Sequence, residues 1–256
     1  MTTAGSVTVR ALRSGADGCL DDAVIGDLFA ATLLLGRPLG YHLAAAHRYA
    51  DLCLGWYLGP GRADAAVAVD EHGAIHGYAL VCINGAHHAR WVRWRSARLA
   101  ARVLGGLLIG RVDRPSRRFY SDRLRDTMAL WRGQRRTEAP AHAHLNVVTG
   151  SRSGSAALVL RNHIDERCRV AGITAWSGEI NAVVGTRERA LERLGLAVVH
   201  RDPNHTLSAS TGHQVVRLTV HREVPAAAAA KPAVSTAAPS DHRHGLVAES
   251  PELTTL

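Results

Sequence analysis

Apolar and polar residues follow one another along most of the chain with the periods of alternating strands and helices. A period of two, typical of strands, marks the segments 7–12, 65–69, 75–83, 141–148, 175–181, 196–209 and 214–222. Spacings of three and four, typical of amphipathic helices, mark 20–35, 42–58, two stretches within 86–138, the stretch with Leu160, Ile164 and Cys168, and 186–194. The segments 65–69 and 75–83 flank Glu71-His72-Gly73 and are predicted to form a hairpin. Residues 225–256 lack a periodic apolar pattern, and we expect a disordered tail there.

A strand, a loop of small residues and a helix follow one another between residues 141 and 170. The predicted strand leads directly into Thr-Gly-Ser-Arg-Ser-Gly-Ser at 149–155, and helical spacing begins at once. Because glycine and serine have little or no side chain, backbone N–H groups of such a loop can close on an anion. The dipole of the following helix adds to the attraction. This arrangement predicts a site for an anionic cofactor.

Two motifs of this region have counterparts, in the same order, in one known family. Pro140-Ala141-His142-Ala143-His144-Leu145-Asn146 is similar to a fourth strand that reads Pro-Ala-His-x-His-apolar-Asp, with Asn146 in place of the aspartate. Gly178-Glu179-Ile180-Asn181, a helix and Leu194-Gly195-Leu196 are similar to Glu-apolar-Asn, a helix and Leu-Gly-Phe at the same separation. Together these segments resemble the GNAT acyltransferase superfamily, over roughly residues 60–222.

The resemblance implies a fold, a reaction and a cosubstrate. The implied fold class is mixed α/β (α+β), a mostly antiparallel central sheet flanked by helices, over a domain of residues 1–224. The segment 86–138 would be a helical insertion between the third and fourth strands. The implied reaction transfers an acetyl group from acetyl-CoA to the amine of a small molecule, by direct attack in a ternary complex. The sheet is expected to splay where the thioester enters.

The cofactor loop matches the family pattern Arg/Gln-x-x-Gly-x-Gly/Ala in either of two registers, one with Arg152 as the basic residue and one with Ser151 in its place. Cofactor contacts are therefore expected from Val147, Val148, Ser151, Arg152, Ser153, Gly154, Ser155, Ala156 and Asn181. The family's oxyanion donor, a backbone N–H of the fourth strand, would be near Val147 or Val148. Two positions depart from the family. Leu191 replaces a tyrosine that protonates the leaving thiolate in many relatives, and Val184 replaces an asparagine that often contacts the cofactor.

Three polar residues of the strand 141–148 are candidates for the chemistry. His142, His144 and Asn146 alternate and therefore share one face. If this face lines the acceptor side, His144 is the expected general base with a pKa near neutrality, Asn146 orients the acceptor and His142 contacts it. Alternatively, the face packs against a helix, and backbone carbonyls satisfy both histidines.

Further candidates lie on the neighbouring strand and in the first helices. Glu179 is expected as a base acting through water, or as a hydrogen-bond partner only. Asn181 is expected to cap the following turn or to contact CoA. Tyr41 and His42 are candidates to line the acceptor site, and Tyr57 fits that role and core packing equally well.

Composition narrows the class of protein. The chain has 256 residues, of which 46% are hydrophobic, enough to bury a sizeable core. Its four cysteines (Cys19, Cys53, Cys82 and Cys168) lie far apart in apolar contexts without CxxC spacing, so we expect reduced core thiols and no metal site. The N-terminus has no basic-then-apolar signal, and no stretch reaches the roughly 18 apolar residues of a membrane span. A cytoplasmic protein without membrane contact is expected.

The segment 86–138 is rich in arginine, and its role has more than one interpretation. Fourteen arginines and three aspartates lie between Arg90 and Arg136, within a net charge of +9. The segment could pack on the core with its arginines in water, or cover the acceptor pocket and bind an anionic substrate or the CoA phosphates. The sequence is compatible with an acetyltransferase that forms a homodimer. Two other functions also remain open. One is a non-catalytic binding module of the same fold, and the other is a nucleic-acid-binding protein, which we do not expect because no binding motif is present.

Overall fold

A computed structural model describes residues 6–13, 19–133, 139–148 and 154–226 of the chain. The expected cofactor residues Ser151, Arg152 and Ser153 and nearly all of the expected tail lie outside the described residues. The contacts divide the chain into residues 1–225 and 226–256. All the helices and strands below belong to the first unit.

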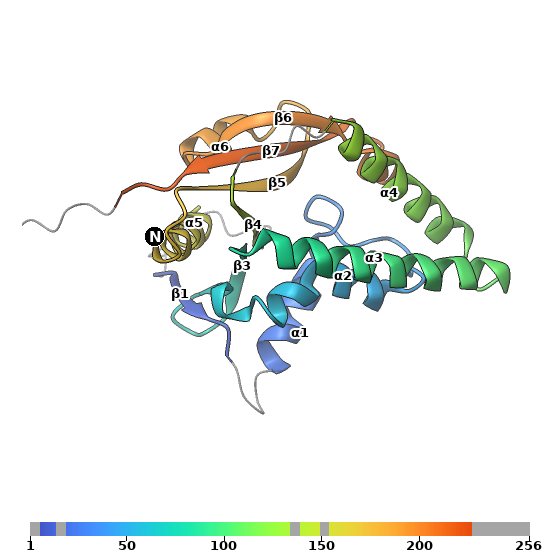
Figure 1. The fold of residues 1–256 in the computed structure, drawn as a ribbon, viewed down its shortest axis with the longest axis horizontal. Coiled ribbons are helices and arrows are strands. Elements are labelled where there is room, and N and C mark those ends of the chain that lie inside the picture. The colour runs from blue at the N-terminus through green and yellow to red at the C-terminus, as the bar shows by residue number, and fades with distance from the viewer. Residues whose placement is uncertain (1–5, 14–18, 134–138, 149–153, 227–256) are drawn as a thin grey trace, which may run out of the picture. The chain divides into compact units, whose positions relative to one another are not determined.

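A single seven-stranded sheet organises this unit, in the order β1-β2-β3-β4-β5-β7-β6 (Figure 1). The strands are β1 Thr8–Ala11, β2 Ala66–Val69, β3 Ile75–Cys82, β4 Ala141–Val147, β5 Ala175–Val183, β6 Ala197–Pro203 and β7 Val215–Glu223. Every neighbouring pair is antiparallel except β4 and β5, which are parallel. The predicted mixed and mostly antiparallel sheet is confirmed, and the segment 7–12 provides β1 at one edge of it.

The sheet opens between β4 and β5. These strands pair over only three positions, from Ala141 opposite Trp176 to Ala143 opposite Gly178, and both continue unpaired with each other beyond that point (Figure 1). A Cβ atom on Gly178 would lie 2.8 Å from the carbonyl oxygen of Ala143. Glycine therefore permits the close approach at the last pair before the strands diverge. We call this opening the fork.

Helices cover both faces of the sheet. They are α1 Cys19–Thr32, α2 Ala46–Leu58, α3 Gly85–Leu108, α4 Arg114–Gly133, α5 Ser155–Val170, α6 Glu188–Arg193 and α7 His205–Thr211. On one face Leu160 and Ile164 of α5 pack with Ala141 and Ala143 of β4, and on the other face α1 and α2 pack on β2 and β3 around Tyr57. Within the described residues, none of the helices combines the length and the apolarity that crossing a bilayer requires.

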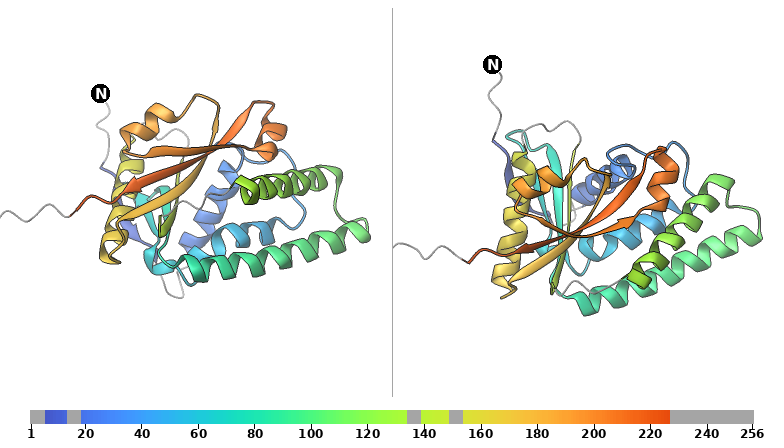
Figure 2. Two further views of the ribbon diagram at one scale, coloured as in Figure 1. Left: turned by 45° about the horizontal axis from the view of Figure 1, so that its top comes forward. Right: turned by 90° about the horizontal axis from the view of Figure 1, so that it is seen from above.

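The arginine-rich segment forms α3 and α4. Helix α3 lies alongside α2, and α4 leads back towards the sheet and contacts α7 (Figure 2). Leu99 and Val103 of α3 and Phe119 of α4 are buried in a cluster with Tyr49 of α2, whereas Trp94 is about half exposed, at 52%. The segment thus packs on α2 through part of the apolar stripe read from the sequence.

The prediction of one strand over 196–209 is wrong in its second half, where helix α7 forms. The side chain of the fully buried Asn204 accepts a hydrogen bond from the backbone N–H of Leu207 at 2.9 Å and caps the helix. The carboxylate of Asp126 on α4 accepts the N–H groups of His205 and Thr206 at 2.7 and 3.2 Å. Contacts from a distant part of the chain therefore override the local alternation.

Candidate functional site

The fork exposes a backbone amide of β4. The N–H of Val148 donates to the carbonyl of His76 on β3 at 2.8 Å, so this amide is already engaged. Amides of an antiparallel ladder alternate between its two edges, and the N–H of Val147 is therefore turned the other way, towards β5. Pairing with β5 has ended at Ala143, so this N–H points into the fork. Of the two expected oxyanion donors, Val147 fits and Val148 does not.

Helix α5 begins just beyond the same end of β4. Gly154 precedes its first turn in a left-handed conformation, with φ of 58°, and a Cβ atom there would meet nothing within 4 Å. The N-terminal turn of a helix, with its backbone N–H groups and the helix dipole, suits an anion. Gly154 thus lies directly before this turn, Ser155 is partly buried, and the side chain of Ala156 is in the core.

The predicted common face of β4 brings its histidines against two helices. The rings of His142 and His144 are 4.5 Å apart and perpendicular, and Tyr57 of α2 lies 5.4 Å from His144. The hydroxyl of Tyr57 is 3.4 Å from Nδ1 of His142, and His88 of α3 stacks on His142 at 6.3 Å. The face does pack against helices, as the alternative interpretation held, but the histidines contact aromatic rings there. Among the described residues, this cluster included, no group of histidine, cysteine and carboxylate side chains is arranged to hold a metal ion.

Burial keeps the three imidazoles neutral. It lowers the pKa of His144 well below the ordinary 6.5, and the nearby His142 and His88 lower it further. Burial also lowers the pKa of His142, against the opposing effect of Glu179, and lowers the pKa of His88 to about 4. The expectation of a near-neutral pKa for His144 is therefore wrong. At physiological pH this residue is a neutral hydrogen-bonding group and a weak base.

Asn146 is held by its own neighbours. Its amide nitrogen donates to the hydroxyl of Thr32 at 2.7 Å and to the hydroxyl of Tyr78 at 3.2 Å. These bonds tie β4 to the last residue of α1 and use both amide hydrogens. Only the amide oxygen of Asn146 is left for an acceptor.

Polar side chains of β5 face the same side as the histidines of β4. Ser177 lies opposite His142, so Glu179 and Asn181 follow on the same face beyond the fork. The carboxylate of Glu179 is 3.6 Å from Nε of Arg217 on β7, whose side chain is only 7% exposed. The amide oxygen of Asn181 accepts from Asn204 at 2.8 Å, which ties this end of β5 to the start of α7.

Tyr41 and His42 lie beside the first turns of α4. Tyr41 packs on the cluster around Tyr49, and burial, followed by Asp113 and Asp122, raises its pKa. His42 is exposed, and its electrostatic partner is Asp113. The structure thus places this pair at the far end of α2 from the histidines.

Two arginines, one beside Glu179 and one beside Tyr49, were not recognised as candidate site residues in the sequence. Arg217 is described above, and Arg123 of α4 places its guanidinium carbon 5.7 Å from the ring centre of Tyr49. Arg123 follows the buried Phe119 by four positions, so a charge falls on the apolar face of an amphipathic helix. That pattern was the available signal for Arg123.

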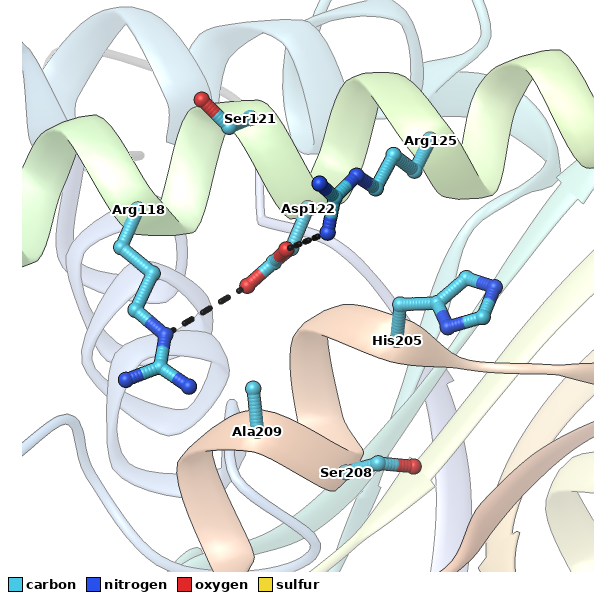
Figure 3. Close-up of a pocket in the computed structure, with 7 residues that line it drawn as sticks. All are labelled: Arg118, Ser121, Asp122, Arg125, His205, Ser208 and Ala209. Carbon is cyan, nitrogen blue, oxygen red and sulfur yellow. Dashed lines mark hydrogen bonds and ion pairs between the residues drawn. The ribbon is translucent and has the colours of Figure 1, made fainter.

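A hollow of about 540 Å³ lies between α4 and α7 (Figure 3). It is lined by Arg118, Ser121, Asp122, Arg125, His205, Ser208 and Ala209. Asp122 is 3.4 Å from Arg125 and 3.9 Å from Arg118, whose side chains are both largely exposed. Among the residues that the structure describes, none of those predicted for catalysis or cofactor binding lines this hollow.

Comparison with known proteins yields structural matches only. No protein-family model and no curated protein matches the sequence. An apo-form mutant of agmatine N-acetyltransferase is 17% identical over 85% of this chain and 99% of its own, with a TM-score of 0.52. The structure named SsHAT is 15% identical over 86% and 100%, with a TM-score of 0.50. A GNAT superfamily phosphinothricin acetyltransferase from Sinorhizobium meliloti, in complex with acetyl-CoA, is 16% identical over 90% of this chain and 94% of its own. Its TM-score of 0.47 is too low to support a conclusion about this chain. At these identities the similarity shows the fold alone.

Proposed function

Since the chain has the fold of the GNAT acetyltransferases, we propose that it transfers an acetyl group from acetyl-CoA to the amine of a small molecule. The observation that carries this proposal is the fork, because it places a strand amide, a helix N-terminus and a polar face beside one another. The N–H of Val147 is turned into the opening, and Gly154 directly precedes α5, which packs on β4. His142, His144 and Glu179 lie on the side from which an acceptor would enter.

The unpaired edge of β4 suits the extended arm of acetyl-CoA. This arm contains amide groups, which can pair with a free strand edge as an added strand would. The N-terminal turn of α5 would then hold phosphate oxygens through its backbone N–H groups. Gly154 leaves open space at that position, so the phosphate can approach the backbone closely.

The residues at the fork supply the elements of a direct attack. As the amine nitrogen bonds to the thioester carbonyl carbon, negative charge grows on the carbonyl oxygen, and the N–H of Val147 is placed to stabilise it. The C–S bond then breaks, and the CoA thiolate takes a proton from water. Leu191, where many relatives carry a tyrosine, is buried in the core and cannot donate that proton.

The amine must lose a proton before or during its attack. We assign this step to Glu179, whose side chain is partly exposed and can pass the proton to water. His144 would accept a hydrogen bond from the amine as a neutral imidazole and direct its lone pair, because the lowered pKa makes it a weak base. Asn146 would contribute through its amide oxygen.

Calorimetric titration with acetyl-CoA tests the cofactor half of the proposal. The informative variant is Gly154→Glu, and its matched control is Gly172→Glu at the other end of α5. Both glycines have positive φ, 58° and 69°, and open space around a Cβ atom, so the backbone strain is similar. We expect micromolar binding by the wild type and by Gly172→Glu, and a loss of about tenfold or more in Gly154→Glu, since a carboxylate would repel the phosphates.

Release of the CoA thiol from acetyl-CoA in the presence of amines tests the proposed acetyl transfer. Failure of the wild type to bind acetyl-CoA would overturn the proposal. Binding without turnover of any amine would instead favour a non-catalytic binding module.

A further inference from the structure

Helix α3 turns an apolar face to solvent, opposite the side that packs on α2. The members of this face recur every three or four residues, so they lie on one side of the helix. They are Trp94, Ala97, Ala101, Leu104 and Leu108, all of them exposed. We call this set the α3 face. The buried Leu99 and Val103 lie on the other side of the helix, in the cluster with Tyr49.

The α3 face continues into the turn between α3 and α4. Leu108 is 87% exposed, and Leu104 and Ile109 are exposed by 60% and 61%. The turn is closed from within by the buried Val112, which packs so closely that a Cβ atom on Gly106 would lie 2.8 Å from its Cγ2. The turn therefore has its own apolar contact, while its other large aliphatic side chains stay in water.

Helix α3 forms an outer edge of the unit in both views of Figure 2, with the turn at the end away from the sheet. It begins three residues after β3 ends. Its 24 residues carry the chain about 36 Å from that strand. A patch of large apolar side chains in such a position indicates contact with something outside the chain.

Arginines surround this patch, with hardly any carboxylates among them. Residues 90–118 contain nine arginines and one acidic residue, Asp113, and α3 itself contains no carboxylate. The carboxylate of Asp113 accepts the backbone N–H of Ser116 at 2.8 Å. The guanidinium carbon of Arg98 lies 4.5 Å from the ring centre of Trp94, so a cation lies directly beside the α3 face. A partner of this face must therefore offer both apolar groups and negative charge.

We propose that the α3 face and the adjoining turn bind the surface of a membrane that contains anionic lipids. The aliphatic side chains would enter the boundary between headgroups and acyl chains, and the arginines would pair with lipid phosphates. Trp94 suits the same boundary, because an indole ring has an apolar body and one N–H donor. This contact lies on the membrane without crossing it, and it replaces the expectation from the sequence of no membrane contact. It does not depend on acetyl transfer.

Two other partners fit this surface less well. A second copy of the chain, related by a two-fold axis, would bring the arginines of one α3 against those of the other, and neither helix has a carboxylate to offset the repulsion. A nucleic acid would pair with the arginines but leave Leu104, Leu108 and Ile109 in water. The boundary of an anionic bilayer offers both kinds of group.

Flotation of the full chain with protein-free vesicles tests the inference. The vesicles contain phosphatidylcholine alone or a mixture with the anionic phosphatidylglycerol. At low salt we expect about tenfold stronger binding to the mixture, and a decrease as added salt screens the arginines. Fluorescence gives a second measurement, because the emission of Trp94 should shift to shorter wavelength as its ring leaves water. The variant Trp94→Phe should lack this shift.

A double variant of the turn tests the apolar part of the contact. Leu108→Ser with Ile109→Ser removes apolar area and should weaken binding to the mixed vesicles about tenfold or more. The matched control is Val170→Ser with Val199→Ser, which removes exposed apolar area on α5 and β6 and should bind as the wild type. All four side chains are exposed, so the fold should tolerate both double variants.

A second double variant tests the charge. Arg98→Gln with Arg102→Gln should weaken binding to the mixed vesicles about tenfold or more, because two cations near the anionic surface are lost. The control is Arg189→Gln with Arg193→Gln on α6, which has the same net charge and should bind as the wild type. All four arginines are exposed.

Four results decide the inference. Binding that is lost in both α3 double variants and kept in both controls would support it. Failure of the wild type to bind the mixed vesicles at low salt, or binding that Leu108→Ser with Ile109→Ser retains, would overturn it. A dimer in sedimentation equilibrium that this variant splits would overturn it in favour of a second copy. Binding of labelled RNA that Arg98→Gln with Arg102→Gln weakens, without vesicle binding, would overturn it in favour of a nucleic acid.

Discussion

The three partly buried imidazoles should make the fold sensitive to mild acid. Burial lowers the pKa of His88, His142 and His144, so the folded protein keeps them neutral at a pH where the unfolded chain would bind protons. The unfolded state then holds more protons, and the free energy of unfolding falls as the pH falls. The contribution of these groups is fully present above pH 6.5, the ordinary value, and is lost as the pH approaches their folded values.

His88 gives the magnitude. Its pKa falls from 6.5 to about 4, and at 1.36 kcal/mol per pKa unit a fully shielded ring would contribute about 3.4 kcal/mol. Because the ring is partly exposed, solvent screens the effect, and we expect about half of this value. By pH 5, where the unfolded chain is protonated and folded His88 is still mostly neutral, the loss should be about 1 kcal/mol.

Urea denaturation at pH 7 and pH 5 measures this loss. The comparison uses the wild type, His88→Gln and His72→Gln, a control whose side chain is 82% exposed in the wild type. The free energy of unfolding should fall by about 1 kcal/mol less in His88→Gln than in the other two proteins. An equal fall in all three would show that His88 is not shielded, and the assignment of a neutral cluster would be wrong.

Three further changes test the fold and the fork. Asp126→Ala should lower the free energy of unfolding by about 3 kcal/mol, because it leaves the buried donors of α7 unpaired; urea denaturation checks this, and a loss no larger than for a surface residue would contradict it. Gly178→Val should cost about 1–3 kcal/mol and weaken acetyl-CoA binding, since its Cβ would meet the carbonyl of Ala143; calorimetry of the folded variant should show the weaker binding, and an unchanged affinity would argue against a role for the fork. Leu160→Ala should cost about 2–5 kcal/mol, because Leu160 is fully buried in the core, yet leave KM for the acceptor unchanged in steady-state kinetics.

Elements with a strong local pattern could be predicted from the sequence, and those that depend on distant contacts could not. Helix α5 follows from the spacing of Leu160, Ile164 and Cys168, all fully buried against the sheet. Helix α7 was missed because its stability comes from Asn204 and from Asp126, which is about 80 positions away in the chain. Nothing in the local alternation of 196–209 reports that contact.

The candidate site, like the fold, could be predicted from the sequence only in part. The common face of His142, His144 and Asn146 follows from the period of a strand alone. Their chemistry does not, since the lowered pKa of His144 comes from packing among elements far apart in the chain. The choice of Val147 over Val148 likewise required the register with β3.

The geometry at the fork assigns cofactor and acceptor to different parts of the chain. The groups proposed to hold acetyl-CoA are backbone amides of β4 and α5, which need small residues rather than particular side chains. The groups proposed to act on the acceptor are the side chains of Glu179 and His144, from β5 and β4. Because Glu179 and His144 are not among the groups proposed to hold acetyl-CoA, substitution of either should change the use of the acceptor without changing the affinity for acetyl-CoA.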